Sequence, residues 1–207
     1  MSTLVESGIA LRHGLIKKHK NAAVAALCGG LPALLLSTLV PFRGWRCLLG
    51  LAVGLLWGNW FEYAYHRWLL HRPRSLLGKG HLEHHANVGT EEEAEHVALG
   101  KSPLYVFLLF ALNAAILLPI DLLLHLAMSA GVFLGWAIYL ITTEEIHWRV
   151  HMNGWLPPGL RAARLYHMRH HDIPNSRYNV FLPLFDWLFR TNSSPIKLRV
   201  EARSRVG

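Results

Sequence analysis

Fourteen histidines occur in this sequence of 207 residues, and their spacing is the first indication of its chemistry. Ten of them fall into four short windows with the patterns HxxxxH, HxxHH, HxxxH and HxxHH. The ten are His66 and His71, then His81, His84 and His85, then His147 and His151, and last His167, His170 and His171. Imidazole nitrogen is a ligand for iron, zinc, copper and nickel, so this density of histidines predicts a metal site.

The spacing within each window has a geometric meaning on a helix. Residues i, i+3 and i+4 share one face, so each HxxHH predicts three imidazoles directed at one centre, and HxxxH predicts two. The His66 and His71 side chains lie about 140° apart on a regular helix. That pair converges only if the helix end unwinds; otherwise the two residues serve different metals. Ten nitrogens exceed the four of one tetrahedral site, so the sequence predicts two metal ions.

Other interpretations of the histidines fit less well. Haem ligands would lie one per helix inside apolar spans, and a metal transporter would place its ligands near the membrane midplane, whereas these windows lie outside the apolar runs. Structural zinc sites rarely use more than four ligands. A catalytic dimetal site is therefore the leading interpretation, with a non-catalytic zinc-binding or haem-binding membrane protein as the alternative. The remaining histidines are interpreted as surface or membrane-interface residues: His13, His19, His96 and His125.

Long apolar runs must position these windows. The chain is 52% hydrophobic and only 16% charged, with a mean hydropathy of +0.25, which excludes a disordered chain and a typical soluble enzyme. The runs are long enough to span a hydrocarbon core of about 30 Å. We expect transmembrane helices at about 22–41, 47–65, 103–119 and 122–143, with the turn between the last two at Pro119 and Asp121. The first run exceeds a signal-peptide core and lacks a small-residue cleavage pattern, so we expect it to be retained.

This pattern predicts an all-α integral membrane protein in which a helical cap holds the dimetal site. The predicted parts are a basic N-terminal segment 1–21 and one membrane-embedded domain 22–207, whose cap comprises residues 66–101 and 144–207.

The positive charge lies mostly on one side of the predicted spans. The net charge is +8 and the pI is about 9.9; 19 Lys and Arg residues lie on one side, against Arg43 and Arg46 on the other. By the positive-inside rule, we expect both termini and the predicted metal site to be cytoplasmic. No helix-turn-helix or zinc-finger pattern accompanies the charges, so anionic lipid headgroups, not nucleic acid, are the expected partners. Cys28 and Cys47 lie in apolar runs and are expected to be buried thiols.

The order of these motifs around membrane helices resembles the fatty acid hydroxylase and sterol desaturase superfamily of integral membrane diiron enzymes. The segment EYAYHRWLLH at 62–71 is similar to the EYxxHRxxxH segment of fatty acid 2-hydroxylases. The segment HMRHHDIPNSRYNVFLPLFDWLFRT at 167–191 resembles the closing stretch of the superfamily, in which HxxHH precedes an Asn and a Trp/Phe-Asp…Phe…Thr motif. The resemblance covers about residues 62–191.

The resemblance implies a membrane-bound oxidoreductase that hydroxylates a C–H bond of a fatty acyl or related lipid with O₂. It implies two iron ions held by the ten histidines, with zinc compatible with the same ligands. Desaturation of a sterol or other lipid at the same site is the alternative reaction. Glu62, Asp172 and Asn179 match positions near the ligands and are candidates to orient imidazoles.

Four aromatic residues near the first window are candidates to line the approach of the lipid chain: Trp57, Trp60, Phe61 and Trp68. Their alternative role is an aromatic belt at the membrane interface.

We expect the electrons to come from a separate protein. The sequence shows no fused cytochrome b5 domain and no glycine-rich nucleotide fingerprint after a strand. The expected donor is a cytochrome b5-like or ferredoxin-like protein with its reductase. The short chain without a donor domain favours a bacterial inner membrane over the endoplasmic reticulum.

Overall fold

The computed structural model describes residues 2–39 and 44–193, and every regular element within them is a helix. The four long helices are α1 (Ser2–Leu39), α2 (Gly44–Tyr65), α5 (Leu104–Leu123) and α6 (Ser129–His151). The short ones are a π-helix (His66–Leu70), α3 (Leu76–Ala86), α4 (Glu93–Val97), a 3₁₀ helix (Pro158–Leu160), α7 (Arg161–Asp172) and α8 (Leu184–Leu188). The all-α prediction is confirmed for these residues. Arg43, the end of the first predicted span and the cap residues from 194 onward lie outside them.

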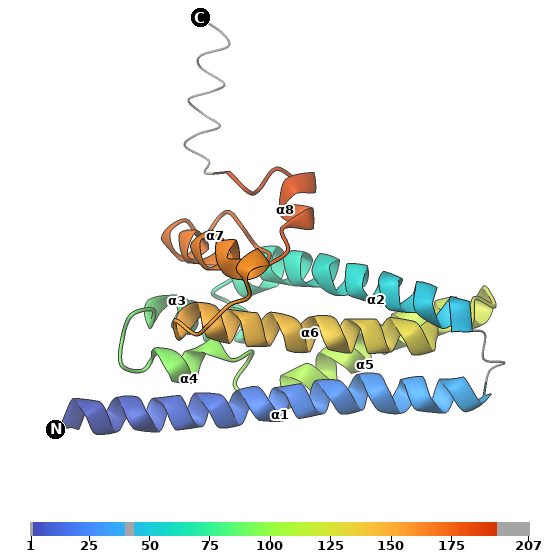
Figure 1. Cartoon of the computed structure of the whole chain (residues 1–207), viewed down its shortest axis with the longest axis horizontal. Coiled ribbons are helices and arrows are strands. Elements are labelled where there is room, and N and C mark those ends of the chain that lie inside the picture. The colour runs from blue at the N-terminus through green and yellow to red at the C-terminus, as the bar shows by residue number, and fades with distance from the viewer. Residues whose placement is uncertain (1, 40–43, 194–207) are drawn as a thin grey trace, which may run out of the picture.

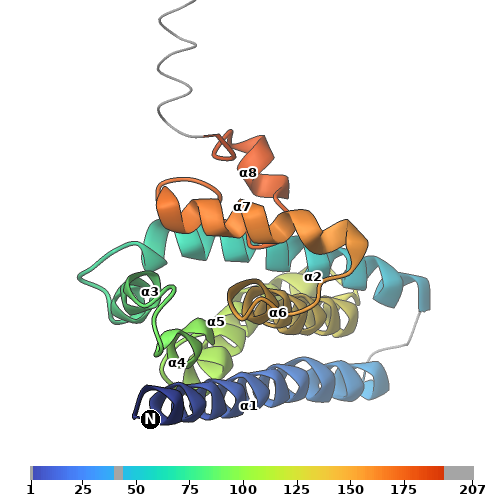
Figure 2. The same ribbon diagram turned by 60° about the vertical axis from the view of Figure 1, so that its left-hand side comes forward.

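Helix α6 lies at the centre of the molecule, between α1 on one side and α2 on the other (Figure 1). Helix α7 lies above α2, on the side away from α1, and α3 and α4 gather near the C-terminal end of α6 (Figure 2). The histidine windows lie in the π-helix segment directly after α2, at the C-terminal end of α6, and on α3 and α7. All four windows therefore meet at one end of the helical bundle.

Glycines bring α2 and α6 into backbone contact. Gly50, Gly54 and Gly58 recur every four residues on one face of α2, and Gly131 and Gly135 face them from α6. A Cβ atom added at Gly54 would collide with the Val132 carbonyl. Small residues at this spacing allow two helices to approach closely and fix their register. This register sets where the histidines at the two helix ends lie relative to one another.

Helix α1 continues without a break through residue 21, where we expected the basic segment to end. No strong helix breaker occurs before Pro32, and the helix is roughly 57 Å long, about twice the hydrocarbon thickness. Its basic half packs on the rest of the protein: Lys18 Nζ lies 2.5 Å from Glu145 Oε2, and Asn21 Nδ2 donates to Glu144 Oε1 at 2.7 Å. The basic segment is thus part of the helical bundle.

The turn between α5 and α6 lies later than the prediction at Pro119 and Asp121. Helix α5 continues to Leu123 because a proline removes one backbone hydrogen bond without having to end a helix. The Asp121 carboxylate then accepts hydrogen bonds from the backbone N–H groups of Met128 and Ser129, both at 3.0 Å. Asp121 therefore caps the start of α6.

Helix α6 also extends beyond the predicted end at residue 143. Residues 144–151 contain no glycine or proline, so the helix continues to His151. As a result, the third histidine window lies on a rigid helix and not in a separate cap segment.

Two of the described helices are long and apolar enough to cross a membrane, with candidate spans at Glu6–Thr38 and Leu104–Leu123. The predicted spans in α2 and α6 stay predictions.

Candidate metal centre

The structure gathers the ten histidines into two groups of five. Group one consists of His66, His71, His81, His85 and His170. Group two consists of His84, His147, His151, His167 and His171. Within each group, one ring nitrogen from every residue lies within 4.8 Å of the others. Residues far apart in the sequence thus converge as the prediction of two metal ions requires.

The two HxxHH motifs are divided between the groups. Helix α3 directs its first and last histidines to group one and its middle histidine to group two, and α7 does the reverse. The prediction that each motif serves one centre is therefore wrong. Positions i and i+4 differ by about 40° around a helix, whereas i+3 lies about 60° to the other side of i. Each helix lies between the two groups, so this angular spread sends one ring across to the neighbouring group.

The HxxxxH pair converges on group one, with the ring centroids of His66 and His71 5.1 Å apart. The intervening segment is the π-helix His66–Leu70, which replaces the last α-helical turn after α2. A π-helix bonds residue i to residue i+5, and this wider turn brings residue i+5 back over residue i. Of the two alternatives, the unwound helix end is the one observed.

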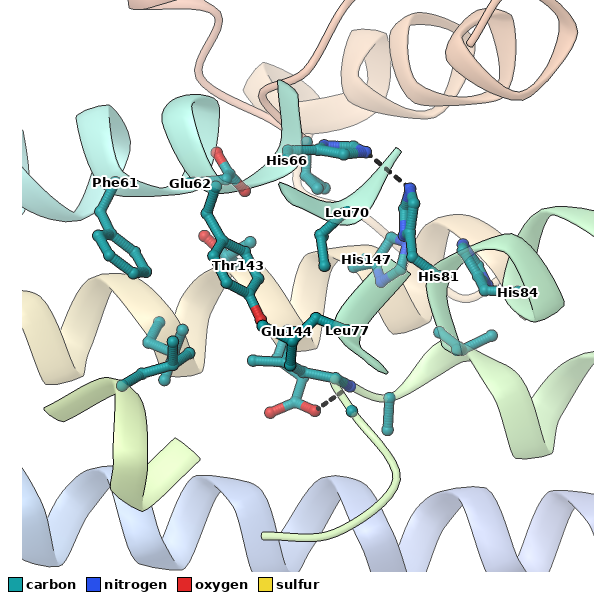
Figure 3. A pocket seen from close by; sticks show the side chains of 18 of the residues that line it. Phe61, Glu62, His66, Leu70, Leu77, His81, His84, Thr143, Glu144 and His147 are labelled. Carbon is teal, nitrogen blue, oxygen red and sulfur yellow. Dashed lines mark hydrogen bonds between the residues drawn. The ribbon is translucent and has the colours of Figure 1, made fainter. Parts of the chain in front are cut away.

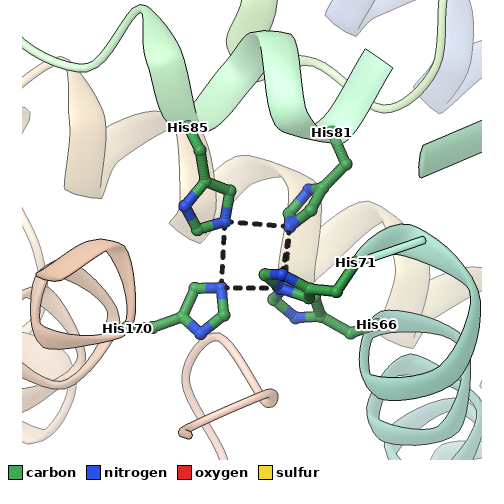
Figure 4. Close-up of side chains that lie close together, drawn as sticks. All are labelled: His66, His71, His81, His85 and His170. Atoms are coloured by element: carbon green, nitrogen blue, oxygen red, sulfur yellow. Dashed lines mark hydrogen bonds between the residues drawn. The ribbon is translucent and has the colours of Figure 1, made fainter. Parts of the chain in front are cut away.

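The ring nitrogens of group one are too close together to be explained by hydrogen bonding alone (Figure 4). His81 Nε2 lies 3.0 Å from His66 Nε2, 3.3 Å from His71 Nε2 and 3.0 Å from His85 Nε2. A neutral imidazole nitrogen carries either one proton or one lone pair. The three contacts therefore cannot all be hydrogen bonds, and the nitrogens converge as ligands do around a cation.

Two rings of group one have a defined tautomer. His66 Nδ1 donates to the Tyr178 carbonyl oxygen at 2.5 Å, and His170 Nδ1 donates to the Ser176 carbonyl oxygen at 2.6 Å. Because a carbonyl oxygen can only accept, both protons lie on Nδ1. The Nε2 lone pairs of His66 and His170 consequently point into group one, available for a metal.

Group two has a similar geometry. His167 Nε2 lies 3.0 Å from His147 Nε2, 3.1 Å from His151 Nε2 and 3.0 Å from His171 Nε2. The two ring nitrogens of His84 are buried, and neither has a hydrogen-bond partner among the described residues. Buried polar groups normally have partners. A cation within the group would supply a partner for one of these two nitrogens.

The protonation states suit metal binding. Burial, together with neighbouring imidazoles for most of the rings, lowers the pKa of nine of the ten histidines. The pKa falls to about 4 for His71 and His85 and to about 3 for His170. These rings are neutral at pH 7, which is the form that binds metal. The donor set therefore fits two cations.

A carboxylate that the sequence analysis missed supports group two. His151 Nδ1 donates to Glu93 Oε1 at 2.7 Å, and the Gly89 N–H donates to Glu93 Oε2 at 2.8 Å. Burial opposes the charge of Glu93, but these hydrogen bonds outweigh it and lower the pKa of the carboxyl. Glu93 belongs to the acidic run 91–95, and nothing in its local sequence distinguishes it from its neighbours.

We expect the substitution Glu93→Gln to weaken metal binding at group two by about 10- to 100-fold, because a carboxylate that orients a ligating histidine contributes that much. Group one is expected to keep its affinity. Metal content after dialysis against a graded series of chelator concentrations measures the change. The matched control is the exposed Glu91→Gln, and equal retention of metal by the two variants would contradict the role assigned to Glu93.

The three candidate orienting residues differ in their surroundings. Asn179 Nδ2 and Tyr139 Oη both donate to Glu62 Oε2 at 2.8 Å. Asp172 is exposed at the end of α7, and its side chain makes no hydrogen bond or ion pair with the described residues. Glu62 and Asn179 thus belong to one buried network beside group one, and Asp172 does not.

A mostly apolar cavity lies beside both groups (Figure 3). Its apolar wall includes Phe61, Leu109, Trp136 and Leu140. Histidines from both groups line it as well: His66, His81, His84, His147 and His167. A hydrocarbon chain in this cavity would therefore lie next to both candidate metal positions.

Of the four aromatic residues proposed to line the lipid approach, only Phe61 lines this cavity. Trp57 Nε1 donates to Asn113 Oδ1 at 3.1 Å, toward α5. Trp60 packs against Trp68, with ring centroids 5.9 Å apart, and against aromatic rings of the α8 region. Trp57 and Trp60 therefore pack against neighbouring helices, and Trp68 is exposed at the protein surface.

The geometry agrees with a comparison of sequences. The profile of the family described as "Fatty acid hydroxylase" matches residues 18–191. The chain belongs to the fatty acid hydroxylase family. This membership confirms the resemblance to the superfamily. Together with the two apolar helices, it also indicates association with a membrane.

A solved structure has the same fold. It is described as full-length Scs7p with only the hydroxylase domain visible, and the TM-score is 0.60 at 23% identity. The match covers 84% of this chain and 64% of that chain, so this protein spans slightly less than two thirds of it. A search of curated proteins gives no significant match.

Proposed function

We propose that this protein is a membrane-bound diiron oxygenase that hydroxylates a C–H bond of a fatty acyl or related lipid. The observation that carries the proposal is the pair of five-histidine groups beside one apolar cavity. Each group would hold one iron ion through its neutral imidazoles. Bound iron supplies the redox chemistry with O₂, while a separate cytochrome b5-like or ferredoxin-like protein supplies electrons.

The residues of the chain position the substrate and exclude water. Phe61, Trp136 and Leu140 contact a hydrocarbon chain through apolar surfaces and hold one carbon beside the histidine groups. Positioning of this kind accounts for a large part of the rate of an enzymatic reaction. The apolar wall also keeps water away from the reacting carbon, which protects it from side reactions.

The surface of the bundle supports four membrane spans, one each in α1, α2, α5 and α6, within a single membrane-embedded domain. All four helices expose large apolar side chains, and these lie mainly outside the histidine-bearing end. Examples are Leu27, Leu31, Leu34 and Leu35 of α1, Leu48, Leu49 and Leu56 of α2, Leu112, Ile116 and Leu123 of α5, and Ile138 of α6. Exposed surface of this extent is typical of contact with lipid. With the basic residues at the other end, we place the metal centre and both termini in the cytoplasm, at a bacterial inner membrane.

The test combines metal and lipid analysis. Protein purified without oxygen is expected to hold two iron ions per chain and no haem absorbance. Cells that express it under ¹⁸O₂ are expected to contain a lipid with one added ¹⁸O atom. The balance is RH + O₂ + 2e⁻ + 2H⁺ → ROH + H₂O. A new double bond without label would identify a desaturase, and zinc alone with unchanged lipids would refute the oxygenase.

Filling the cavity is expected to block the substrate without removing metal. Leu140→Trp places a large ring in the apolar wall, and a displacement of the substrate by about 1 Å lowers the rate by about 100-fold. Product formation and metal content are measured on the same preparation. Ile138→Trp, on the exposed face of the same helix, is the matched control and should retain activity. If both variants hydroxylate at the normal rate, the hydrocarbon chain of the substrate does not bind in this cavity.

A further inference from the structure

A buried loop supports group one from outside. All five residues of Ser176–Val180 are buried, and the loop contains none of the ten histidines. Its Ser176 and Tyr178 carbonyl oxygens accept the hydrogen bonds that determine the tautomers of His170 and His66. The position of this loop therefore determines where two Nε2 atoms of group one point.

One carboxylate holds the loop in place. Asp186, in α8, is fully buried. Its Oδ1 accepts a hydrogen bond from the Tyr178 N–H at 2.9 Å, and its Oδ2 accepts one from the Asn179 N–H at 2.8 Å. Thr191 Oγ1 donates a third bond to Oδ1 at 2.7 Å. Hydrogen bonds to an ionised acceptor are among the strongest in proteins, and two of these bind adjacent amides of the loop.

The loop backbone needs this support. Arg177 has a φ of 58°, in the left-handed region that residues with a side chain rarely adopt. Its N–H donates to the Thr191 carbonyl oxygen at 2.9 Å, so Thr191 ties down the same turn from the other side. Strained backbone persists where the surrounding structure holds it, and here the holding residues are Asp186 and Thr191.

The hydrogen bonds that the loop makes to ring nitrogens go to group one, and its contact near group two is apolar, through Val180 in one core cluster with Ile146 and Val150 of α6. In group two, His151 is held by Glu93 of α4, and His147 has a hydrogen bond to the Val97 backbone at the end of the same helix. The histidines that α7 gives to group two, His167 and His171, have Nδ1 atoms without a hydrogen-bond partner among the described residues. The two groups thus have separate supports: a carboxylate in direct contact for group two, and a carboxylate acting through a loop for group one.

We propose that Asp186 is a positioning residue that sets the metal affinity of group one and leaves that of group two unchanged. This inference rests on the proposed function only in requiring that both groups bind metal. Loss of the carboxylate would release the Tyr178 and Asn179 amides, move the loop carbonyls and disorient the Nε2 atoms of His66 and His170. The two metal positions of this enzyme would then be independently adjustable.

The test is a titration of metal-depleted full-length protein in detergent with Co²⁺, which gives one binding step for each group. Asp186→Asn keeps the size of the side chain but replaces one acceptor oxygen with an NH₂ group that cannot accept. We expect the Co²⁺ affinity of one of the two steps, that of group one, to fall by about 10- to 100-fold, and the affinity of the other step to stay unchanged. Glu93→Gln is expected to weaken the other step, and the double variant both. The exposed Asp172→Asn is the matched control.

Thr191→Val removes one of the three hydrogen bonds to the Asp186 carboxylate. It replaces Asp186→Asn as the test variant if Asp186→Asn does not fold. It is expected to weaken the group-one step by a few-fold. Two unchanged steps in Asp186→Asn, or equal weakening of both steps in either variant, would overturn the proposal, because a merely structural residue affects both groups. Wild-type protein that binds no metal would refute the proposed function itself, so the two failures are distinguishable.

Discussion

Replacing His170 with alanine is expected to abolish product formation and to leave about one metal ion per chain. His170 is fully buried and belongs to group one, where its ring lies 3.3 Å from His71 Nε2 and 3.1 Å from His85 Nε2. A residue that only orients a ligand is worth about 10- to 100-fold in affinity or activity, so loss of a ligand should exceed about 100-fold. His84→Ala should have the same consequence at group two.

The measurement pairs metal content with product formation on the same purified protein. His19→Ala, an exposed histidine on α1, is the matched control and should retain two metal ions and full activity. A His170→Ala or His84→Ala protein that remains active would show that the ligands are misassigned. Retention of one metal in each variant would support two separately filled centres.

Substitution of Gly54 by leucine is expected to disrupt both centres together. A Cβ at this position collides with the Val132 carbonyl, so α2 and α6 must separate or slide. Forcing extra atoms into a packed interface costs about 1–3 kcal/mol, and the rigid backbone on both sides favours the upper end. Since α2 leads into His66 and α6 carries His147, a shift between these helices displaces members of both groups.

The expected results for Gly54→Leu are a lower midpoint of thermal unfolding in detergent and the loss of most of both metals. Gly30→Leu, on α1, is the matched control because a Cβ there meets no atom within 4 Å. Normal metal content in Gly54→Leu would show that the register of α2 and α6 does not determine the centres.

Several features of this protein follow from local sequence. The apolar runs predict helices, and the all-helical architecture follows from them. The boundaries are less predictable. The sequence predicts a helix end at Pro119, but the helix continues to Leu123, because one lost hydrogen bond does not outweigh the helical preference of the flanking residues. The GxxxG spacing of α2 was visible in the sequence, but its importance depends on which helix faces it.

Supporting residues were the hardest to predict. Glu93 is one of several acidic residues in its run, and it contacts His151, 58 positions away. Asp186 lies in the segment 167–191 that resembles the closing stretch of the superfamily, yet its role depends on the folded position of the Ser176–Val180 loop. Contacts between distant residues leave no periodic pattern for sequence analysis to detect.

The sequence alone determined that ten histidines meet at one end of a helical membrane-associated protein, because residue type and helical spacing act locally. Only the tertiary structure decided how they divide. Each HxxHH motif lies between the two histidine groups and contributes to both, and the π-helix brings His66 and His71 to the same group. Spacing defines the directions of side chains around their own helix. The destination of each ring depends on the packing and register of the neighbouring helices, which no single segment encodes.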